Sequence, residues 1–223
     1  MPPAAEALPQ PGFAGDAPRP RVGFSVDVPD HWTVLDLDPG TQRRWLDAFL
    51  DQRLAGRPQP PQARQAARQA LLDVLRRLNE AKVFLAAILA GEVDGTLVSA
   101  SATLAWHRPD PSGGIPSLGA LREVYARAPA GTGQDTAARR VEVVTLSAGG
   151  AVKISTRETV ELPTGVRVDG VAMIQYVVPV LATGWLALLT TTSGVPALAE
   201  CVSEVADTMA ASLRFEPAAP ATA

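Results

Sequence analysis

The sequence predicts an α+β fold, with a central antiparallel sheet and helices packed on both of its faces. Three observations support this class. Apolar residues alternate in strand-like segments that follow one another in pairs joined by tight turns. Apolar residues recur at helical spacing in four other segments. The order is two strands, two helices, two strands, a short helix, four strands and a closing helix, and such runs of hairpins indicate an antiparallel sheet.

The first elements follow a segment rich in Pro, Ala and Gly, residues 1–20, which predicts a flexible tail. Residues 24–38, FSVDVPDHWTVLDLD, predict two short strands paired as a hairpin by the turn at Pro29 and Asp30. Trp32 follows this turn, and we expect it to anchor the first strands in the core. The helices at 41–56 and 62–81 each place one apolar stripe inward.

The remaining elements are strand pairs separated by one short helix. The strands at 82–92 and 95–107 are joined by an Asp-Gly turn, and a short helix is expected at 118–128. Four strands follow at 139–147, 151–162, 166–181 and 184–194, and the closing helix is opened by Pro196. Because no linker divides these elements, we expect one domain over 21–216 and a second flexible tail at 217–223.

Composition narrows the function classes. Charged residues make up 19% of the chain and the net charge is −3, which argues against nucleic acid as a main partner. Apolar stretches are shorter than the ~20 residues of a membrane span, and no secretion signal is visible, so we expect a cytoplasmic protein without membrane insertion. The high Ala, Pro and Gly content, with Arg far above Lys, indicates a GC-rich bacterial genome such as that of an actinobacterium.

Catalytic and metal-binding patterns are weak. The two histidines, His31 and His107, fall at a turn and at a strand end, where both are expected to be solvent-exposed. The single cysteine, Cys201, excludes a cysteine zinc site and is expected to be a small buried residue. We therefore predict no cofactor, no metal and no catalytic residues. A polar strand end at 190–193, TTTS, is interpreted as a helix cap, with a pocket rim as the alternative.

Two stretches carry a resemblance to a known superfamily. The segment FSVDVPDHW resembles the opening hairpin of the Mog/PsbP-like α/β/α sandwich proteins, and WLALLTTTSG with MAASLRF resembles their closing strand and helix. This superfamily includes the Ran-binding Mog proteins, the photosystem PsbP proteins and the LpqN-like bacterial branch. The resemblance implies an α/β/α sandwich and a non-catalytic binding or assembly role.

The leading hypothesis is therefore a non-catalytic protein-interaction or adaptor module of a bacterial cytoplasmic assembly or secretion-associated system. Its partner is expected to be another protein or a second copy of the chain. Arg43, Arg44 and Trp45 on the first helix, with Arg108 and Asp110 in the loop 108–116, are the candidate partner-binding residues.

Two alternatives remain open. A START-like helix-grip fold would make the chain a carrier of a small apolar ligand, with a cavity lined by Trp106, Tyr176, Trp185 and Met209. A hydrolase using His31 or His107 with a neighbouring aspartate is the third hypothesis.

Overall fold

The computed structural model describes residues 20, 22–55, 60–93, 96–109, 114–127, 139–161, 167–180 and 183–217. The strands are β1 (Val22–Ser25), β2 (Thr33–Val34), β3 (Val83–Val93), β4 (Thr96–His107), β5 (Arg140–Leu146), β6 (Gly149–Glu161), β7 (Arg167–Val180), β8 (Trp185–Ser193) and β9 (Arg214–Pro217). The helices are α1 (Gln42–Leu54), α2 (Pro61–Glu80), α3 (Leu118–Arg127) and α4 (Ala199–Ser212), and a 3-10 turn, Pro196–Leu198, precedes α4. The tails predicted at both ends lie almost entirely outside the described residues.

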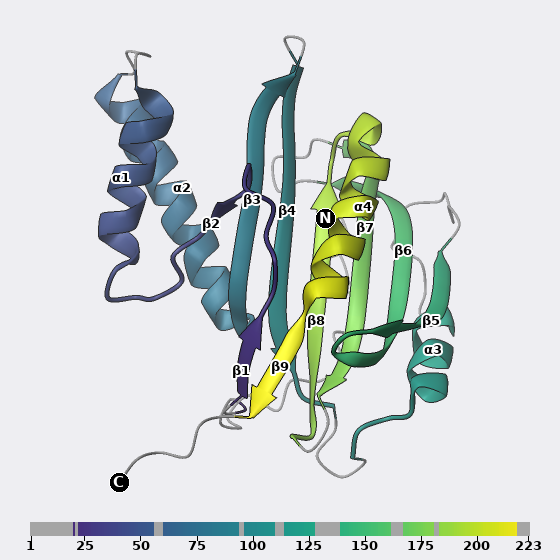
Figure 1. The fold of residues 1–223 in the computed structure, drawn as a ribbon. Helices are drawn as coiled ribbons and strands as arrows, with labels where there is room; N and C mark the ends of the chain where they lie inside the picture. Colours follow the sequence, from purple (N-terminus) through teal and green to yellow (C-terminus); the bar gives the residue numbers. More distant parts are fainter. Residues whose placement is uncertain are drawn as a thin grey trace, which may run out of the picture.

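Seven strands form one antiparallel sheet in the order β2-β3-β4-β8-β7-β6-β5. Three of the predicted hairpins are present, namely β3–β4, β5–β6 and β7–β8, and β8 also pairs with β4, which joins them into one sheet. This arrangement confirms the predicted α+β class (Figure 1). β5 and β2 are the two outer strands.

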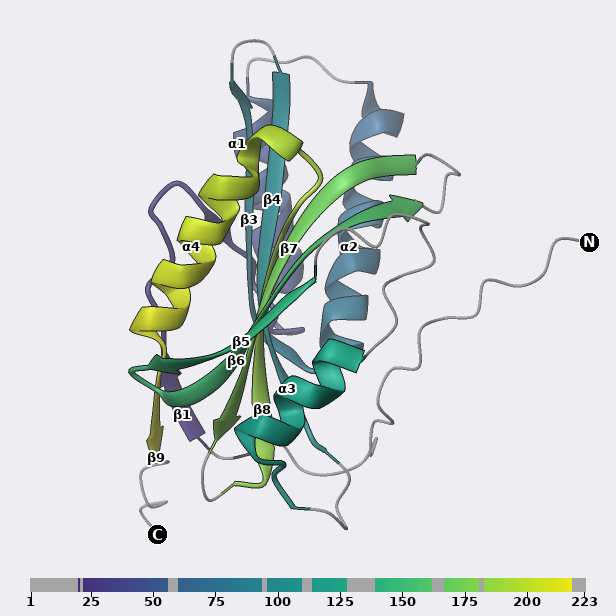
Figure 2. The same cartoon turned by 90° about the vertical axis from the view of Figure 1, so that its right-hand side faces the viewer.

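Side-chain alternation along the strands produces two apolar faces. On β4, Ala102, Leu104 and Trp106 point toward α4 and belong to the main core cluster. Ala105, between them in the sequence, belongs to the cluster under α2. Figure 2 shows α4 on one side of the sheet and α2 and α3 on the other, so helices cover both faces as predicted.

Each helix covers a different part of the sheet. α4 is fully buried along Ala206, Met209 and Ala210, because this stripe recurs at helical spacing and faces the central strands. Leu75 of α2 packs on the residues of β3 nearest to it. Leu121 of α3 packs on β6 and on neighbouring strands at the opposite end of the same face.

The prediction that β1 and β2 pair with each other as a hairpin is wrong. The turn between them exists, since the backbone N–H of Trp32 donates to the carbonyl of Pro29 at 2.9 Å. β1 nevertheless pairs with β9, a strand after α4 that the sequence analysis did not separate from the helix. β2 instead joins the edge of β3. Alternation identifies a strand, but it does not identify the strand's partner.

The β1–β9 ribbon is attached to the main core by aromatic rings. Phe24 meets Phe84 edge to face with centroids 4.6 Å apart, and Phe84 stacks on Trp106 at 4.4 Å. Phe215 of β9 lies 5.8 Å from the same indole. The ribbon thus extends the core on the α4 side of the sheet, where it meets the end of β4.

Candidate interaction surface

The α1–α2 hairpin stands beside the outer end of the sheet near β3 (Figure 1). Leu46 and Leu50 form the buried side of α1, and Leu75 is the buried anchor of α2. Arg53, at the end of α1, donates to the carbonyl of Ala90 at 3.0 Å and to the hydroxyl of Thr33 at 3.2 Å. These contacts fix the hairpin to β2 and β3.

Two ion pairs join the helices of the hairpin to each other. Arg68 donates to Asp47 at 2.8 Å, and Arg64 donates to Asp51 at 2.6 Å. The hydrogen bond from Arg68 holds the pKa of Asp47 below its usual value, and the same bond raises the pKa of the Arg68 guanidinium. Because these groups are at least partly exposed to solvent, their contribution to stability is small, but they neutralise both aspartates of α1.

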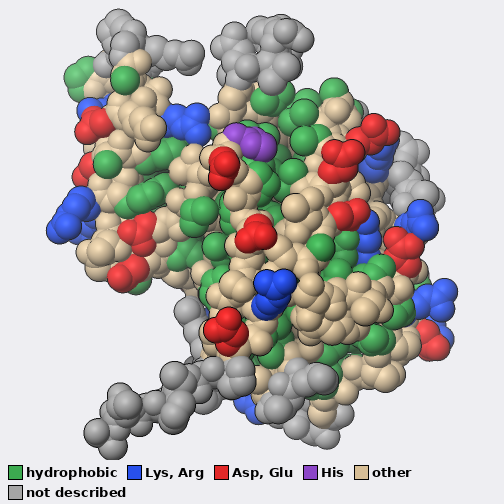
Figure 3. All heavy atoms as spheres, in the orientation of Figure 1, with side chains coloured by type: hydrophobic (Ala, Val, Ile, Leu, Met, Phe, Trp, Pro, Cys, Tyr) green, Lys and Arg blue, Asp and Glu red, His purple; other side chains and the backbone are tan. Residues whose placement is uncertain are grey.

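The hairpin keeps a positive charge after these pairs are formed. α1 has three arginines and two aspartates, while α2 has four arginines, one Asp and one Glu, so seven cations against four anions give +3. Side chains of both signs appear on this part of the molecule in Figure 3. Arg43 and Arg44 are exposed, and neither forms an ion pair with any of the described residues. Arg77 of α2 is also exposed and forms no ion pair with the described residues, so the uncompensated surface charge lies on Arg43, Arg44 and Arg77, while Arg53 is held by Ala90 and Thr33.

Trp45 does not share the surface of Arg43 and Arg44. Its ring is half-buried, stacks on Phe49 at 5.1 Å and packs against the core cluster that contains Leu75. Consecutive helical residues are turned by about 100° from each other, so three in a row cannot all face one partner. The structure thus gives Trp45 a packing role behind the arginines.

The second predicted surface, the loop 108–116, is only partly described. Arg108 places its guanidinium 5.8 Å from the ring centroid of Trp185, on the α4 side of the sheet. Asp110 lies outside the described residues. Arg108 therefore does not join the cluster formed by Arg43 and Arg44, since α1 and α2 pack against the other face of the sheet.

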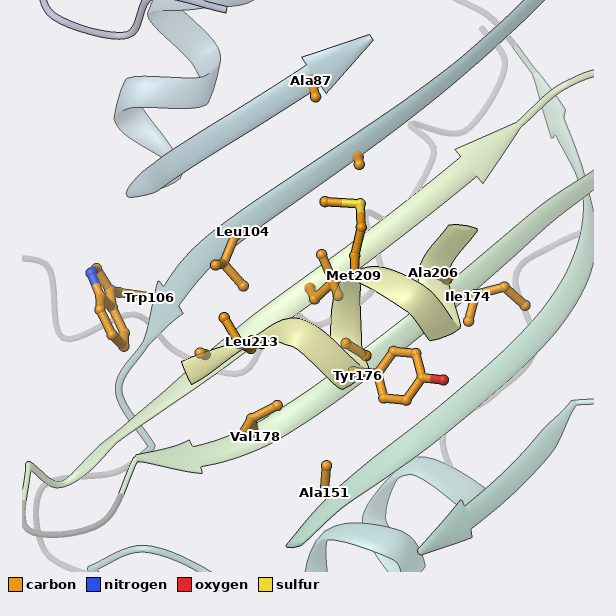
Figure 4. Packing of buried hydrophobic residues seen from close by; sticks show 14 of the residues in the cluster. Ala87, Leu104, Trp106, Ala151, Ile174, Tyr176, Val178, Ala206, Met209 and Leu213 are labelled. Atoms are coloured by element: carbon orange, nitrogen blue, oxygen red, sulfur yellow. The ribbon is translucent and has the colours of Figure 1, made fainter. Parts of the chain in front are cut away.

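The four residues predicted to line a ligand cavity all lie in the packed core. Trp106, Tyr176, Trp185 and Met209 belong to one cluster between α4 and the sheet. Figure 4 shows Met209 of α4, and Leu213 directly after this helix, among the side chains of the neighbouring strands. A carrier of the helix-grip kind would need α4 to withdraw from these contacts before a ligand could enter.

Tyr176 also takes part in a polar contact at the edge of this core. Its hydroxyl donates to Asp207 of α4, and the ammonium of Lys153 binds the same carboxylate oxygen at 2.6 Å. Burial, followed by the hydrogen bond to Asp207, raises the pKa of Tyr176. A phenol that stays protonated is a stable hydrogen-bond donor. We therefore interpret this cluster as a polar contact that fixes α4 to the strands β6 and β7.

The polar end of β8 is internally satisfied. Thr190 accepts from Gln175 at 3.1 Å, and Thr192 shares a hydrogen bond of 2.7 Å with Ser101. On the opposite face, Ser193 donates to the carbonyl of Ser99 at 2.8 Å and accepts from the N–H of Val195 at 3.1 Å. These bonds favour a structural role, since the hydroxyls fix β8 to its neighbours and shape the turn before α4. The predicted helix cap is wrong, because neither the 3-10 turn nor α4 has a side-chain cap hydrogen bond, and Ser193 binds the N–H of Val195 ahead of both.

The two histidines differ in their exposure to solvent. His31 is exposed in the turn before Trp32, as predicted. His107 at the end of β4 is buried, so the prediction that it is solvent-exposed is wrong. This burial lowers the pKa of its imidazole. Its side chain lies on the α2 side by strand alternation, whereas Trp106 faces α4. Cys201 is exposed rather than buried, so that prediction is also wrong.

The described residues contain no group of three or more metal-ligating side chains and no helix that is long and apolar enough to span a bilayer. No family model and no curated protein matches the sequence. The solved structures similar to this chain include LpqN involved in cell envelope biogenesis of Mycobacterium tuberculosis, at 14% identity, covering 93% of this chain and 90% of that one with a TM-score of 0.42. This is a weak likeness in fold, and it supports no statement about function.

Proposed function

We propose that this chain is a non-catalytic protein-binding module whose partner contacts the outer surface of the α1–α2 hairpin. The observation that carries the proposal is the uncompensated charge of Arg43 and Arg44 on a helix whose aspartates are already paired with α2. An acidic segment is the partner that this surface fits, because arginine forks bind carboxylates in a bidentate manner.

The hairpin presents these arginines on a rigid support. Leu46 and Leu50 hold α1 against the molecule, and the stacked pair Trp45 and Phe49 fills the space behind the exposed turn. A pre-ordered helix loses little conformational entropy on binding, which favours affinity. Complementary charge would mainly accelerate association and select the partner.

We place the module in the bacterial cytoplasm, as part of a larger assembly or a secretion-associated system. The exposed thiol of Cys201 is compatible with a reducing compartment, where free cysteines persist. The identity of the assembly follows from its partner, so the experiment starts from partner capture.

The test compares three forms of the full chain as bait in native lysate: wild type, the Arg43→Glu/Arg44→Glu variant and a control variant. Arg122→Glu/Arg157→Glu is the matched control, because it makes the same charge change at exposed arginines on α3 and β6. We expect a protein with an acidic segment to be captured by the wild type and the control and lost from the first variant. Its retention should fall as salt rises from about 0.05 to about 0.5 M.

Two outcomes of this experiment would contradict the proposal. If every captured protein is retained equally by the Arg43→Glu/Arg44→Glu variant, the hairpin is not the binding surface. If captured proteins are lost from both variants, the interaction depends on overall charge and the proposal of a specific surface is wrong.

The carrier and hydrolase hypotheses remain predictions with less support. The carrier would expose Met209 and its neighbours, which are fully buried between α4 and the sheet. Native mass spectrometry of the purified chain would detect a bound apolar ligand. The hydrolase would depend on His31 in an exposed turn or on His107 beneath the other face, and activity lost in either alanine variant would support it.

A further inference from the structure

The two outer edges of the seven-stranded sheet differ in how far other parts of the chain pair with their backbone. The β3 edge is covered, since Thr33 and Val34 of β2 pair with it. The N–H of Leu35 donates to the carbonyl of Ala86 at 2.8 Å, and Arg53 reaches the carbonyl of Ala90 at 3.0 Å. Covering an edge in this way is how proteins prevent unwanted strand pairing.

On the other edge, β5 pairs with no strand on its outer side in the described part of the chain, although α3 packs on one of its faces near Val141. It is the last strand of the sheet and pairs only with β6. Its register to β6 runs without a bulge from Arg140 to Leu146, and the segment RVEVVTL contains no proline. Its middle residue, Val143, has 48% of its surface exposed, although it is one of the larger apolar residues. A regular, β-branched and open edge is a template for a further strand.

We propose that a second copy of this chain pairs antiparallel along β5, with the two-fold axis passing through Val143. In this register Val143 lies opposite Val143 of the second copy, and Val141 lies opposite Thr145. Three neighbouring β-branched pairs then share one face, which is a favourable cross-strand arrangement. In a two-fold interface both copies contribute the same surface, so the assembly ends at a dimer and does not continue into a fibre.

The charges on β5 are compatible with this register. Arg140 and Glu142 lie on the other face of the strand and form an ion pair of 3.0 Å within one chain. Glu142 meets Glu142 of the second copy only diagonally, where side chains are roughly 7–8 Å apart, and Arg140 neutralises it locally. Opposite Glu142 directly stands Val144, so no like charges are placed face to face.

The proposed dimer leaves the α1–α2 hairpin free. β5 and β3 lie toward opposite ends of the strand order, with the hairpin beside β3 (Figure 1). Pairing through β5 would therefore place the two hairpins at the outer ends of one continuous sheet. The inference is independent of the proposed function, because the two surfaces are separate and are tested by different variants.

The experiment measures the mass of the full chain by sedimentation velocity between roughly 1 and 500 µM, a range that covers a reversible interface of modest size. We expect the wild type to rise from 23.3 kDa toward twice that mass. Val143→Lys and Val143→Glu should each stay monomeric, because each places like charges on the axis. An equimolar mixture of the two should regain the dimer, since Lys would then face Glu.

Val124→Lys is the matched control, because Val124 is an apolar residue on α3 with 63% of its surface exposed. It should dimerise like the wild type. Circular dichroism and a thermal melt establish that every variant is folded, and side chains this exposed tolerate lysine. A wild type that stays monomeric throughout overturns the proposal, and so does a dimer that persists in Val143→Lys or fails to return in the mixture.

Discussion

Replacing Trp32 with alanine tests the assignment of the segment FSVDVPDHW as a core anchor rather than the edge of a site. Trp32 is 6% exposed and belongs to the core cluster between α4 and the sheet. A buried tryptophan removes roughly 150–250 Å² from water, and at ~25 cal/mol per Å² this corresponds to about 4–6 kcal/mol. That figure is an upper bound because unfolded chains are partly compact, so we expect a loss of about 3–5 kcal/mol.

Urea unfolding followed by far-ultraviolet circular dichroism gives the measurement, since that signal does not depend on the deleted indole. With a slope of about 3 kcal/mol per M for a chain of this size, the midpoint should fall by roughly 1–1.7 M. Trp32→Phe retains part of the buried area and should lie between the wild type and Trp32→Ala. It keeps the comparison measurable if the alanine variant does not fold.

His31→Ala is the control, because His31 is exposed and adjacent in the sequence. Surface substitutions of this kind usually change stability by less than about 0.5 kcal/mol. A loss below about 1 kcal/mol for Trp32→Ala, or an equal loss for His31→Ala, would refute the reasoning, because neither result fits a fully packed indole.

Three further substitutions have expected outcomes. Gly150→Ala should cost no more than about 1 kcal/mol in urea unfolding, because its Cβ would lie 2.5 Å from Cδ1 of Leu118, the far end of a side chain that can turn away, and adding Leu118→Ala should remove this cost. Tyr176→Phe should lower the free energy of unfolding by about 1–2 kcal/mol, since it removes the hydroxyl that donates to Asp207. An unchanged urea midpoint would contradict a stabilising contact between α4 and the sheet at this residue. Burial lowers the pKa of His107 in the folded chain, so as the pH falls the unfolded chain protonates this imidazole before the folded chain does. The free energy of unfolding should therefore decrease as the pH drops from about 6.5 toward the folded pKa. His107→Gln should flatten this part of the curve of melting temperature against pH. An unchanged slope would show that other groups cause the pH dependence.

Much of the fold was predictable because it depends on local patterns. Apolar spacing located the four helices, and tight-turn residues located the hairpins within the long strands. The pairing of β1 with β9 was not predictable in the same way, because the partners lie at opposite ends of the chain. Short strands of four residues carry too little pattern to choose between partners.

The placement of the candidate residues was only partly predictable, for related reasons, and their roles stay predictions. Arg43 and Arg44 lie on the surface, as helical spacing suggests, but their neighbour Trp45 turns inward by one further step of the helix. His107 was expected in solvent because it ends a strand. The burial of a strand end depends on the strand's place in the sheet, and β4 lies between β3 and β8, which only the folded order reveals.

The two proposals also constrain each other when they are taken together. A dimer through Val143 would carry two copies of the surface at Arg43 and Arg44, directed away from each other at the ends of one sheet. A partner with two acidic segments would then bind with an affinity raised by effective concentration, provided that its segments span both hairpins. Val143→Lys would lose this gain while keeping the affinity for a partner with a single segment, whereas Arg43→Glu/Arg44→Glu would weaken both. Avidity that survives in Val143→Lys would have to come from a different assembly, so the comparison separates the open edge of β5 from every other route to a bivalent protein.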